Sequence, residues 1–160
     1  MTRASSHLIG LISDTHGLVR PAVHEVLKGV EIILHAGDVG GPEILDELQI
    51  IAPVRAVFGN TDPPGMPGLT ESIDTDIGGV RIHVSHGNEV GSPTPEKLAA
   101  RYNSDVVIYG HTHRQLVTPL NGQLFVNPGA AGPRRFRLSA SVGILKIAGG
   151  KPEVSIVDIA

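Results

Sequence analysis

Residues 8–17 read Leu-Ile-Gly-Leu-Ile-Ser-Asp-Thr-His-Gly, an apolar run that breaks abruptly into a polar loop. The five apolar and glycine residues are typical of a short buried strand. Asp14 and His16 follow that strand directly, and Gly17 allows the chain to turn sharply after them. The stretch therefore predicts a strand with two potential ligands or catalytic groups at its carboxyl end.

The same pattern recurs twice in the next fifty residues. Residues 31–34 form a second apolar run followed by Asp38, and residues 54–58 form a third, followed by Asn60. Between these runs, at residues 21–30 and 42–49, the apolar residues have the spacing of a helix. Strand, polar loop and helix in this order predict a parallel sheet with its polar loops at the carboxyl ends of the strands.

The second half of the chain is richer in strands. We expect a helix at residues 95–102 and strands at residues 72–76, 80–85, 105–109, 115–119, 123–126, 138–147 and 153–157. Two sheets packed face to face, with helices outside, accommodate this number of strands. Neither a repeat nor a linker divides the sequence, so we predict one α/β domain over residues 1–160.

Composition excludes several classes of protein. Of the 160 residues, 41% are apolar and 18% charged, which suits a globular chain. There is no cysteine, so any metal must be held by oxygen and nitrogen ligands. A formal charge of −3 and 3% aromatic residues argue against binding of long nucleic acids. No apolar stretch has the length of a membrane span or a signal core, so we expect a cytoplasmic protein without a membrane partner.

Seven polar side chains that can bind metals follow predicted strands. They are Asp14, His16, Asp38, Asn60, His86, His111 and His113. In an extended segment residues i and i+2 point to the same side, so Asp14 with His16, and His111 with His113, can each aim two side chains at one centre. Two carboxylates, one amide oxygen and four imidazoles exceed what one ion with open positions needs. They suit two ions that share a bridging carboxylate.

Each motif also has a simpler interpretation when taken alone. Asp-x-His, Gly-Asp and Gly-Asn occur more often in turns and caps than in metal sites, and a lone histidine is more often a core or surface residue. All of these interpretations would have to hold together, five times in one short chain and always at strand ends. The metal site is therefore the better hypothesis.

The order Asp-x-His, Gly-Asp, Gly-Asn, His-Gly, Gly-His-x-His resembles that of the calcineurin-like metallophosphoesterase superfamily. It is similar in particular to the small, single-domain bacterial and archaeal phosphodiesterases, which share their fold with the retromer subunit of vacuolar sorting. The resemblance extends from Ile9 through the Asn127-Pro128-Gly129 loop into the final strands. It implies a four-layer α/β sandwich of two mixed β-sheets flanked by helices, in agreement with the strand pattern.

The resemblance also implies a role for each ligand. Asp14, His16 and His113 would bind one metal, Asp38 would bridge both, and Asn60, His86 and His111 would bind the second. The implied reaction is hydrolysis of a small phosphodiester by a hydroxide between two divalent ions, with Asp38, Asn60 and His86 as catalytic residues. Manganese is the preferred metal, and nickel, iron and zinc are alternatives.

Three positions depart from the family pattern. Many relatives have a histidine after Gly-Asn that can protonate the leaving group, whereas this chain has Thr61 and then Asp62. Asn88 replaces a second histidine after His-Gly, and Ala130 stands where serine is common. The general acid is therefore unassigned, and Asp62 and His35 are the candidates for it.

Further polar residues near the motifs have two interpretations each. His35 and His83 could orient ligands, although core or surface positions are the simpler explanation. Arg134, Arg135 and Arg137 could guide anions, but a solvated basic cluster is the simpler explanation.

Other functions remain as alternatives. The main one is a catalytically weak or silent scaffold or interaction protein of the same fold, which the complete ligand set argues against. A metal-dependent regulator with vestigial hydrolysis and a single-metal hydrolase are the others. The sequence leaves the physiological substrate and the oligomeric state open, a homo-oligomer included.

Overall fold

The computed structural model describes residues 6–63, 65–134 and 138–159. In this part of the chain, the first sheet has the strand order β11 (Lys151–Asp158), β10 (Ser141–Ala148), β1 (Ser6–Ile12), β2 (Ile32–His35), β3 (Val54–Val57) and β4 (Leu69–Thr70). The second sheet has the order β5 (Ile73–Ile77), β6 (Val80–Val84), β7 (Val106–Ile108), β9 (Gln123–Asn127) and β8 (Leu116–Leu120). The helices are α1 (Pro21–Val26), α2 (Pro42–Gln49) and α3 (Pro95–Ala99), and a 3-10 turn, η1 (Asn88–Val90), follows β6.

Both sheets are mixed, but the strands that precede the polar loops are parallel within each sheet. β1, β2, β3 and β4 pair in parallel, while β10 and β11 add an antiparallel hairpin beside β1. In the second sheet β6, β7 and β9 are parallel, flanked by antiparallel β5 and β8. The carboxyl ends of parallel strands meet at one edge, so each sheet gathers its polar loops there.

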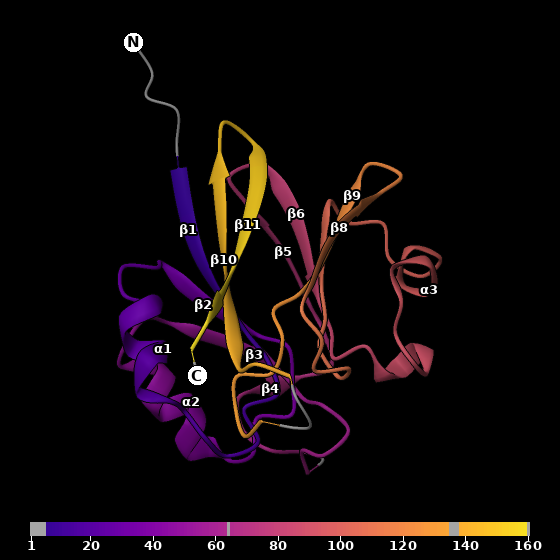
Figure 1. Ribbon diagram of the computed structural model, residues 1–160. Coiled ribbons are helices and arrows are strands. Elements are labelled where there is room, and N and C mark those ends of the chain that lie inside the picture. Colours follow the sequence, from indigo (N-terminus) through magenta and orange to yellow (C-terminus); the bar gives the residue numbers. More distant parts are fainter. Residues whose placement is uncertain (1–5, 64, 135–137, 160) are drawn as a thin grey trace.

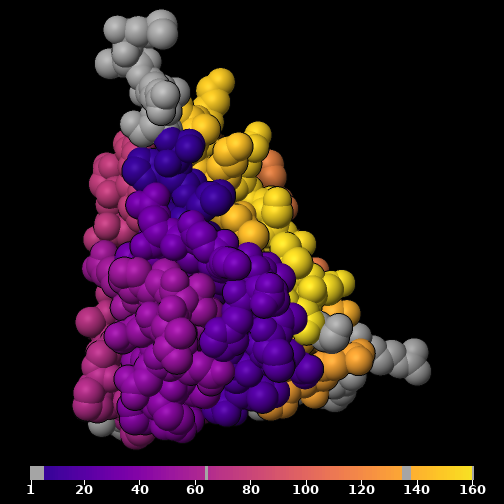
Figure 2. Space-filling model, turned by 90° about the vertical axis from the view of Figure 1, so that its left-hand side faces the viewer, coloured from indigo at the N-terminus to yellow at the C-terminus, as the bar shows by residue number. Residues whose placement is uncertain are grey.

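Three apolar clusters hold four layers together. Ile9, Leu11, Val84, Ile108 and Leu145 belong to the cluster between the two sheets. A second cluster joins the other face of the first sheet to α1 and α2, and a third joins the second sheet to α3. The helices accordingly lie on opposite sides of the paired sheets (Figure 1). Residues of the first half, in indigo and purple, cover the face that carries α1 and α2, beside the yellow C-terminal hairpin (Figure 2). The predicted four-layer α/β sandwich of two mixed sheets is confirmed.

The elements differ from the prediction in length. The helix expected over residues 21–30 ends at Val26, because Gly29 has a φ of +90° that a right-handed helix cannot accommodate. The helix expected over residues 95–102 ends at Ala99. Between the strands predicted over residues 54–58 and 72–76 lies the additional strand β4, whose Thr70 carbonyl accepts a hydrogen bond from Phe58 N at 3.0 Å. Within the described residues, no helix is both long and apolar enough to cross a membrane.

Candidate metal centre

Backbone hydrogen bonds fasten the polar loops to one another. Asp14 N donates to the Gly37 carbonyl at 2.9 Å, and His16 N donates to the Asp38 carbonyl at 3.0 Å, which joins the loops after β1 and β2. The link between the two sheets comes from His111 N, which donates to Asp14 Oδ2 at 3.1 Å. The loops of both sheets therefore form one connected site.

Two groups of ligands are assembled there. Asp14, His16 and His113 form one group, and Asp38, His86 and His111 form the other, with the ligand atoms of each group within 4.8 Å of one another. The seventh predicted residue, Asn60, places its Oδ1 3.1 Å from His111 Nδ1. All seven predicted side chains thus converge, and their division into two groups is the one that the resemblance implies.

Asp38 lies between the two groups. Its Oδ2 is 3.2 Å from His86 Nε2 and 3.7 Å from His16 Nε2, one imidazole from each group. Its Oδ1 accepts a hydrogen bond from Thr61 N at 3.0 Å, which fixes the carboxylate plane. Asp38 is therefore placed to contact both groups, and the bridging role that the resemblance implies stays a prediction.

The unpaired atoms of the site fit divalent metal ions. Asp14 Oδ1 and His16 Nε2 are buried and have no hydrogen-bond partner within the described residues. The other carboxylate oxygen of Asp14 is fully used, since it accepts from Ser13 Oγ at 2.6 Å and from His111 N. Leaving a buried carboxylate oxygen unpaired costs free energy unless a cation or donor satisfies it. Asp14 therefore leaves one buried carboxylate oxygen available to a cation.

The tautomer of His86 is fixed by its backbone partner. Nδ1 lies 2.8 Å from the Ala36 carbonyl, which can only accept, so Nδ1 carries the proton. Nε2 is consequently the ring atom that faces the site, 3.2 Å from Asp38 Oδ2 and 3.3 Å from His111 Nδ1. An imidazole held in this way by a carbonyl is the usual arrangement of a metal-binding histidine.

The electrostatics of the centre favour cations. Burial raises the pKa of Asp14, but its contacts with His113 and His16 outweigh this and hold the pKa far below its usual range. Burial likewise raises the pKa of Asp38, and its contact with His86 outweighs it, so the net pKa is lowered. Both carboxylates are therefore ionised at neutral pH. Burial lowers the pKa of His86, yet the two carboxylates raise it overall.

The ligands adopt an unusual backbone conformation. Within the described residues six non-glycine residues have a positive φ, and five of them are Asp14, His16, Asp38, His111 and His113. The segments are thus not extended, and the argument from i and i+2 spacing was wrong in its geometry. His111 and His113 both reach the centre, but they belong to different ligand groups.

Two glycines are required by close approach. A Cβ on Gly59 would collide with the Asp38 carboxylate, and a Cβ on Gly110 would collide with the Ser13 and Asp14 side chains. Glycine next to Asn60 and His111 therefore leaves space for the side chains of Asp38, Ser13 and Asp14.

Asp62 clamps the loops and is not a free acid. Its Oδ2 accepts from Gly59 N at 2.9 Å and from Val39 N at 3.1 Å, and its Oδ1 accepts from Gly40 N at 3.1 Å. The carboxylate thus binds the loop after β2 to the loop after β3. Sequence analysis missed this role, although an Asp three residues after a glycine in a tight turn is a recognisable signal for backbone capture.

His35 contacts the loops after β1 and β2 from the protein interior. It is completely buried, with Nε2 3.0 Å from Thr15 Oγ1 and Nδ1 accepting from Gly37 N at 3.0 Å. Thr15 Oγ1 in turn donates to the Val39 carbonyl at 2.7 Å. Burial lowers the pKa of His35 to about 4, so the ring is neutral and fully hydrogen-bonded at pH 7. His35 is thus a core residue, as the simpler interpretation expected, and its hydrogen bonds hold the loops that carry Asp14 and Asp38; an orienting role stays a prediction, and its burial excludes direct contact with a substrate.

The remaining candidates lie away from the ligands. His83 Nδ1 is 2.8 Å from Asp74 Oδ1, and its ring stacks on Tyr102 at 3.8 Å between centroids. Arg134 is exposed and donates through Nε to the Leu138 carbonyl. Arg135 and Arg137 lie outside the described residues.

Comparisons with known proteins identify the family of this chain. The chain belongs to the calcineurin-like phosphoesterase superfamily, whose domain profile matches residues 8–150. It is 36% identical over 160 residues to a protein of Methanothermobacter thermautotrophicus described as a probable metallophosphoesterase, covering 94% of this chain and 91% of that one. It is 27% identical over 139 residues to a phosphodiesterase of Methanocaldococcus jannaschii, covering 76% of this chain and 82% of that one.

The fold also has a solved counterpart. Vacuolar protein sorting 29 from Cryptosporidium parvum matches with a TM-score of 0.81 and 25% identity, over 99% of this chain and 100% of that one. The fold of this family therefore occurs both in phosphodiesterases and in a protein named for vacuolar sorting.

Proposed function

We propose that this chain acts as one metallophosphoesterase domain, residues 1–160, that hydrolyses small phosphodiesters with two divalent metal ions. The observation that carries the proposal is the pair of ligand groups, Asp14-His16-His113 and Asp38-His86-His111. The Asp38 carboxylate lies close to imidazoles of both groups. Family membership supports the reaction class, and the similarity to an archaeal phosphodiesterase supports the choice of a diester.

The proposed ligand assignment follows the two groups. One ion would be held by Asp14, His16 and His113, the other by Asn60, His86 and His111, with Asp38 shared between them. Nitrogen and oxygen ligands of this kind suit manganese, our preferred metal, and also nickel, iron or zinc. When bound, such ions supply Lewis acidity and lower the pKa of water from 15.7 to about 7, which provides a nucleophile at neutral pH.

The protein groups would orient the phosphate and neutralise its charge. Asn60 is exposed, and because its Oδ1 faces His111, its amide N–H groups can donate to a non-bridging phosphoryl oxygen. Asp14 and Asp38 contribute two negative charges to the set of seven ligands, and the imidazoles and the amide are neutral. Two divalent ions would therefore leave a positive excess, which a phosphodiester monoanion offsets well.

Protonation of the leaving group has no dedicated residue in this proposal. Thr61 stands where relatives have a histidine, the Asp62 carboxylate is occupied by three backbone amides, and His35 is buried. The leaving oxygen would consequently depart with little help from a protein acid. Esters of acidic alcohols should be the best substrates.

The alternative is a catalytically weak or silent scaffold, which the likeness to the vacuolar sorting protein favours. The complete ligand set and the unpaired buried atoms Asp14 Oδ1 and His16 Nε2 favour the enzyme instead. A scaffold has no need of a buried carboxylate oxygen without a partner.

The test is metal-dependent turnover. Purified protein should contain divalent metal, lose hydrolysis of bis(p-nitrophenyl) phosphate on chelation, and regain it with Mn²⁺. Asp38→Asn should lower turnover by at least about 100-fold, because the shared ligand loses its charge. Asp46→Asn, on the exposed face of α2, is the matched control and should keep wild-type turnover. Near-normal turnover of the Asp38 variant would refute the two-metal mechanism.

A further inference from the structure

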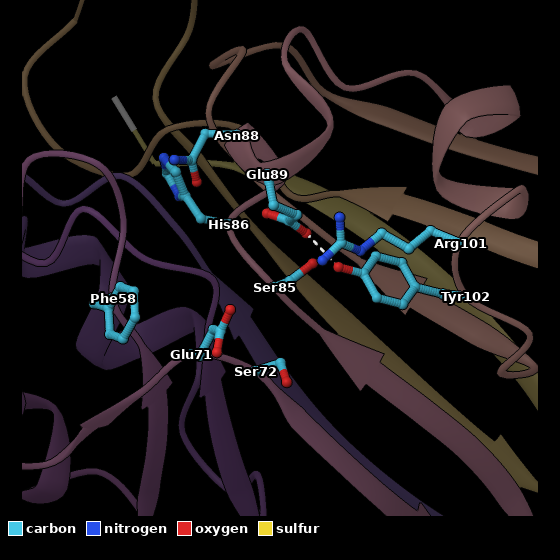
Figure 3. Close-up of a pocket in the computed structure, with 9 residues that line it drawn as sticks. All are labelled: Phe58, Glu71, Ser72, Ser85, His86, Asn88, Glu89, Arg101 and Tyr102. Carbon is cyan, nitrogen blue, oxygen red and sulfur yellow. Dashed lines mark hydrogen bonds between the residues drawn. The ribbon is translucent and has the colours of Figure 1, made fainter.

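A pocket of about 340 Å³ opens directly beside the second ligand group. His86 lines its end nearest the metal centre, Phe58, Glu71 and Ser72 line one side, and Tyr102 lies opposite (Figure 3). The volume is at the lower end of the range of about 300–1,000 Å³ for small-molecule sites. The space suits one ring-bearing group, and it adjoins His86, one of the proposed ligands.

Phe58 is the apolar surface of this pocket. Its side chain is 40% exposed, although its neighbours Ala56 and Val57 on β3 are buried. Its backbone is held by the hydrogen bond to Thr70. The chain has only three phenylalanines and two tyrosines, and two of these five aromatic residues, Phe58 and Tyr102, line this one pocket. Core packing does not account for the exposed ring, whereas binding a flat partner would.

The opposite wall is fixed by hydrogen bonds. Tyr102 Oη donates to Glu89 Oε2 at 2.7 Å, and Gly87 N donates to Glu89 Oε1 at 2.9 Å. The tyrosine ring stacks on His83 behind it. Arg101 reaches along this wall, with Cζ 5.7 Å from the centroid of the Tyr102 ring. Because Gly87 follows His86, the wall is built from the same loop that carries a ligand.

We infer that this pocket binds a flat aromatic or heteroaromatic group on the non-leaving ester of the substrate, stacked on Phe58. The inference rests on the proposed phosphodiesterase function and defines its substrate class as phosphodiesters with one such group, a nucleoside being the natural chemical example. Glu71, Ser72 and Asn88 line the same pocket and offer hydrogen-bonding groups to the edge of a ring.

Charge in the pocket argues for a neutral ring. Two carboxylates, Glu71 and Glu89, face one guanidinium, Arg101, so the lining has a net negative charge. A second phosphate or another anionic group would be repelled, whereas the hydrogen-bond donors of a base or sugar would be accepted. The pocket thus discriminates between the organic groups of a diester, while the metal centre recognises its phosphate.

A pair of diesters with the same leaving group tests the inference. Stacking on one aromatic side chain strengthens binding by roughly 5- to 150-fold. The wild type should therefore hydrolyse p-nitrophenyl thymidine 5′-phosphate with a kcat/KM about 5-fold or more above that of methyl p-nitrophenyl phosphate, mainly through KM. Phe58→Ala should lower this ratio by about 5-fold or more, and Phe58→Tyr should keep it. Ile50→Ala, an exposed apolar residue outside the pocket, should keep the ratio and both rates.

A binding measurement separates this inference from the proposed function. The chain has no tryptophan, so Phe58→Trp introduces a single fluorescent reporter at the pocket. Thymidine 5′-monophosphate should quench this fluorescence with saturation and methyl phosphate should not, and Ile50→Trp should respond to neither. If the wild type hydrolyses both diesters with equal kcat/KM and the reporter is not quenched, the pocket inference is wrong and the phosphodiesterase stands. If nothing is hydrolysed but the nucleotide quenches the reporter, the pocket stands and the proposed reaction is wrong.

Discussion

Asp62→Asn is the substitution that best separates a loop clamp from a general acid. The variant keeps one carbonyl oxygen but loses the charge and one of the two acceptor atoms that receive Val39 N, Gly40 N and Gly59 N. A buried N–H left without an acceptor costs about 1–3 kcal/mol, and hydrogen bonds to a charged group are worth about 1.5–3 kcal/mol. Asp62 is 8% exposed, so water can relieve part of this loss. We expect the free energy of unfolding to fall by about 2–4 kcal/mol.

Thermal unfolding and kinetics measure the two roles separately. For a chain of this length, 1 kcal/mol corresponds to about 2–4 °C in Tm, so Tm should fall by roughly 5–15 °C. Turnover should fall by a similar factor for aryl and alkyl diesters, because displacement of the Asp38 and Asn60 loops affects every substrate. Asp46→Asn on α2 provides the control and should change neither quantity.

The opposite pattern would refute the clamp. Loss of a general acid costs about 10²–10⁴-fold, and only for leaving groups that need protonation. If Asp62→Asn keeps the wild-type Tm, hydrolyses aryl diesters normally and loses alkyl diesters selectively, Asp62 is the acid and the loops are held by other means.

Three further outcomes follow from the same structure. Rates should depend steeply on leaving-group pKa, with aryl diesters far faster than alkyl diesters, since neither Thr61 nor Asp62 can supply a proton; a flat dependence with rate-limiting chemistry would reveal an overlooked acid. In direct competition a small diester should exceed its matching monoester in kcat/KM and inorganic phosphate should inhibit, whereas monoester preference or tight, salt-sensitive oligonucleotide binding would overturn the substrate class. Burial lowers the pKa of His35 from 6.5 to about 4. Between pH 6.5 and pH 4 the His35 ring of the metal-free protein therefore binds a proton in the unfolded state but not in the folded state. The free energy of unfolding of the wild type consequently falls as the pH drops through this range. His35→Gln cannot titrate, so the stability advantage of the wild type over this variant should shrink by about 3 kcal/mol between pH 7 and 4 in urea unfolding, and parallel curves would contradict the assignment.

The strands and the polar side chains that follow them could be predicted because both depend on local pattern. Each apolar run that ends in a polar residue beside glycine became a buried strand with a ligand at its carboxyl end, as with Asp14 after β1 and Asp38 after β2. Because such short runs are buried as strands, the polar loops that follow them must lie at the strand ends. The two-sheet architecture followed from the number of runs.

The conformation of the ligands could not be predicted in this way. His111 and His113 were expected to point to one side of an extended segment, yet their φ values are +73° and +63°, and they belong to different groups. Which group each joins is decided by contacts from the other sheet, such as His111 N with the Asp14 carboxylate. A pairing between residues 97 positions apart has no signature in local spacing.

Supporting residues were the least visible in the sequence. Asp62 was a candidate acid until its three backbone partners were known, and His35 was equally well explained as an ordinary core residue. Phe58 extended the apolar run of β3 in the sequence and became an exposed pocket wall in the structure. In each case the chemistry depends on neighbours that come from other strands.

The backbone strain of the centre bears on whether the chain is an enzyme or a scaffold. A non-glycine residue in the left-handed region costs about 1 kcal/mol, somewhat less for Asp, Asn and His. Five of the six such residues in the described part of the chain are proposed ligands, and the sixth, Asn121, lies in the tight hairpin turn between β8 and β9, where left-handed geometry is ordinary. Packing of the sheets does not require those five conformations, because the strands end before them. Strain concentrated on the proposed ligands is unfavourable unless a cation binds there, and so is a buried Asp14 oxygen that makes no hydrogen bond and lies 3.3 Å from the His113 imidazole nitrogen. In a silent scaffold nothing would offset the backbone strain or the unsatisfied carboxylate oxygen. Both features therefore favour the proposed site, one that binds metal and substrate.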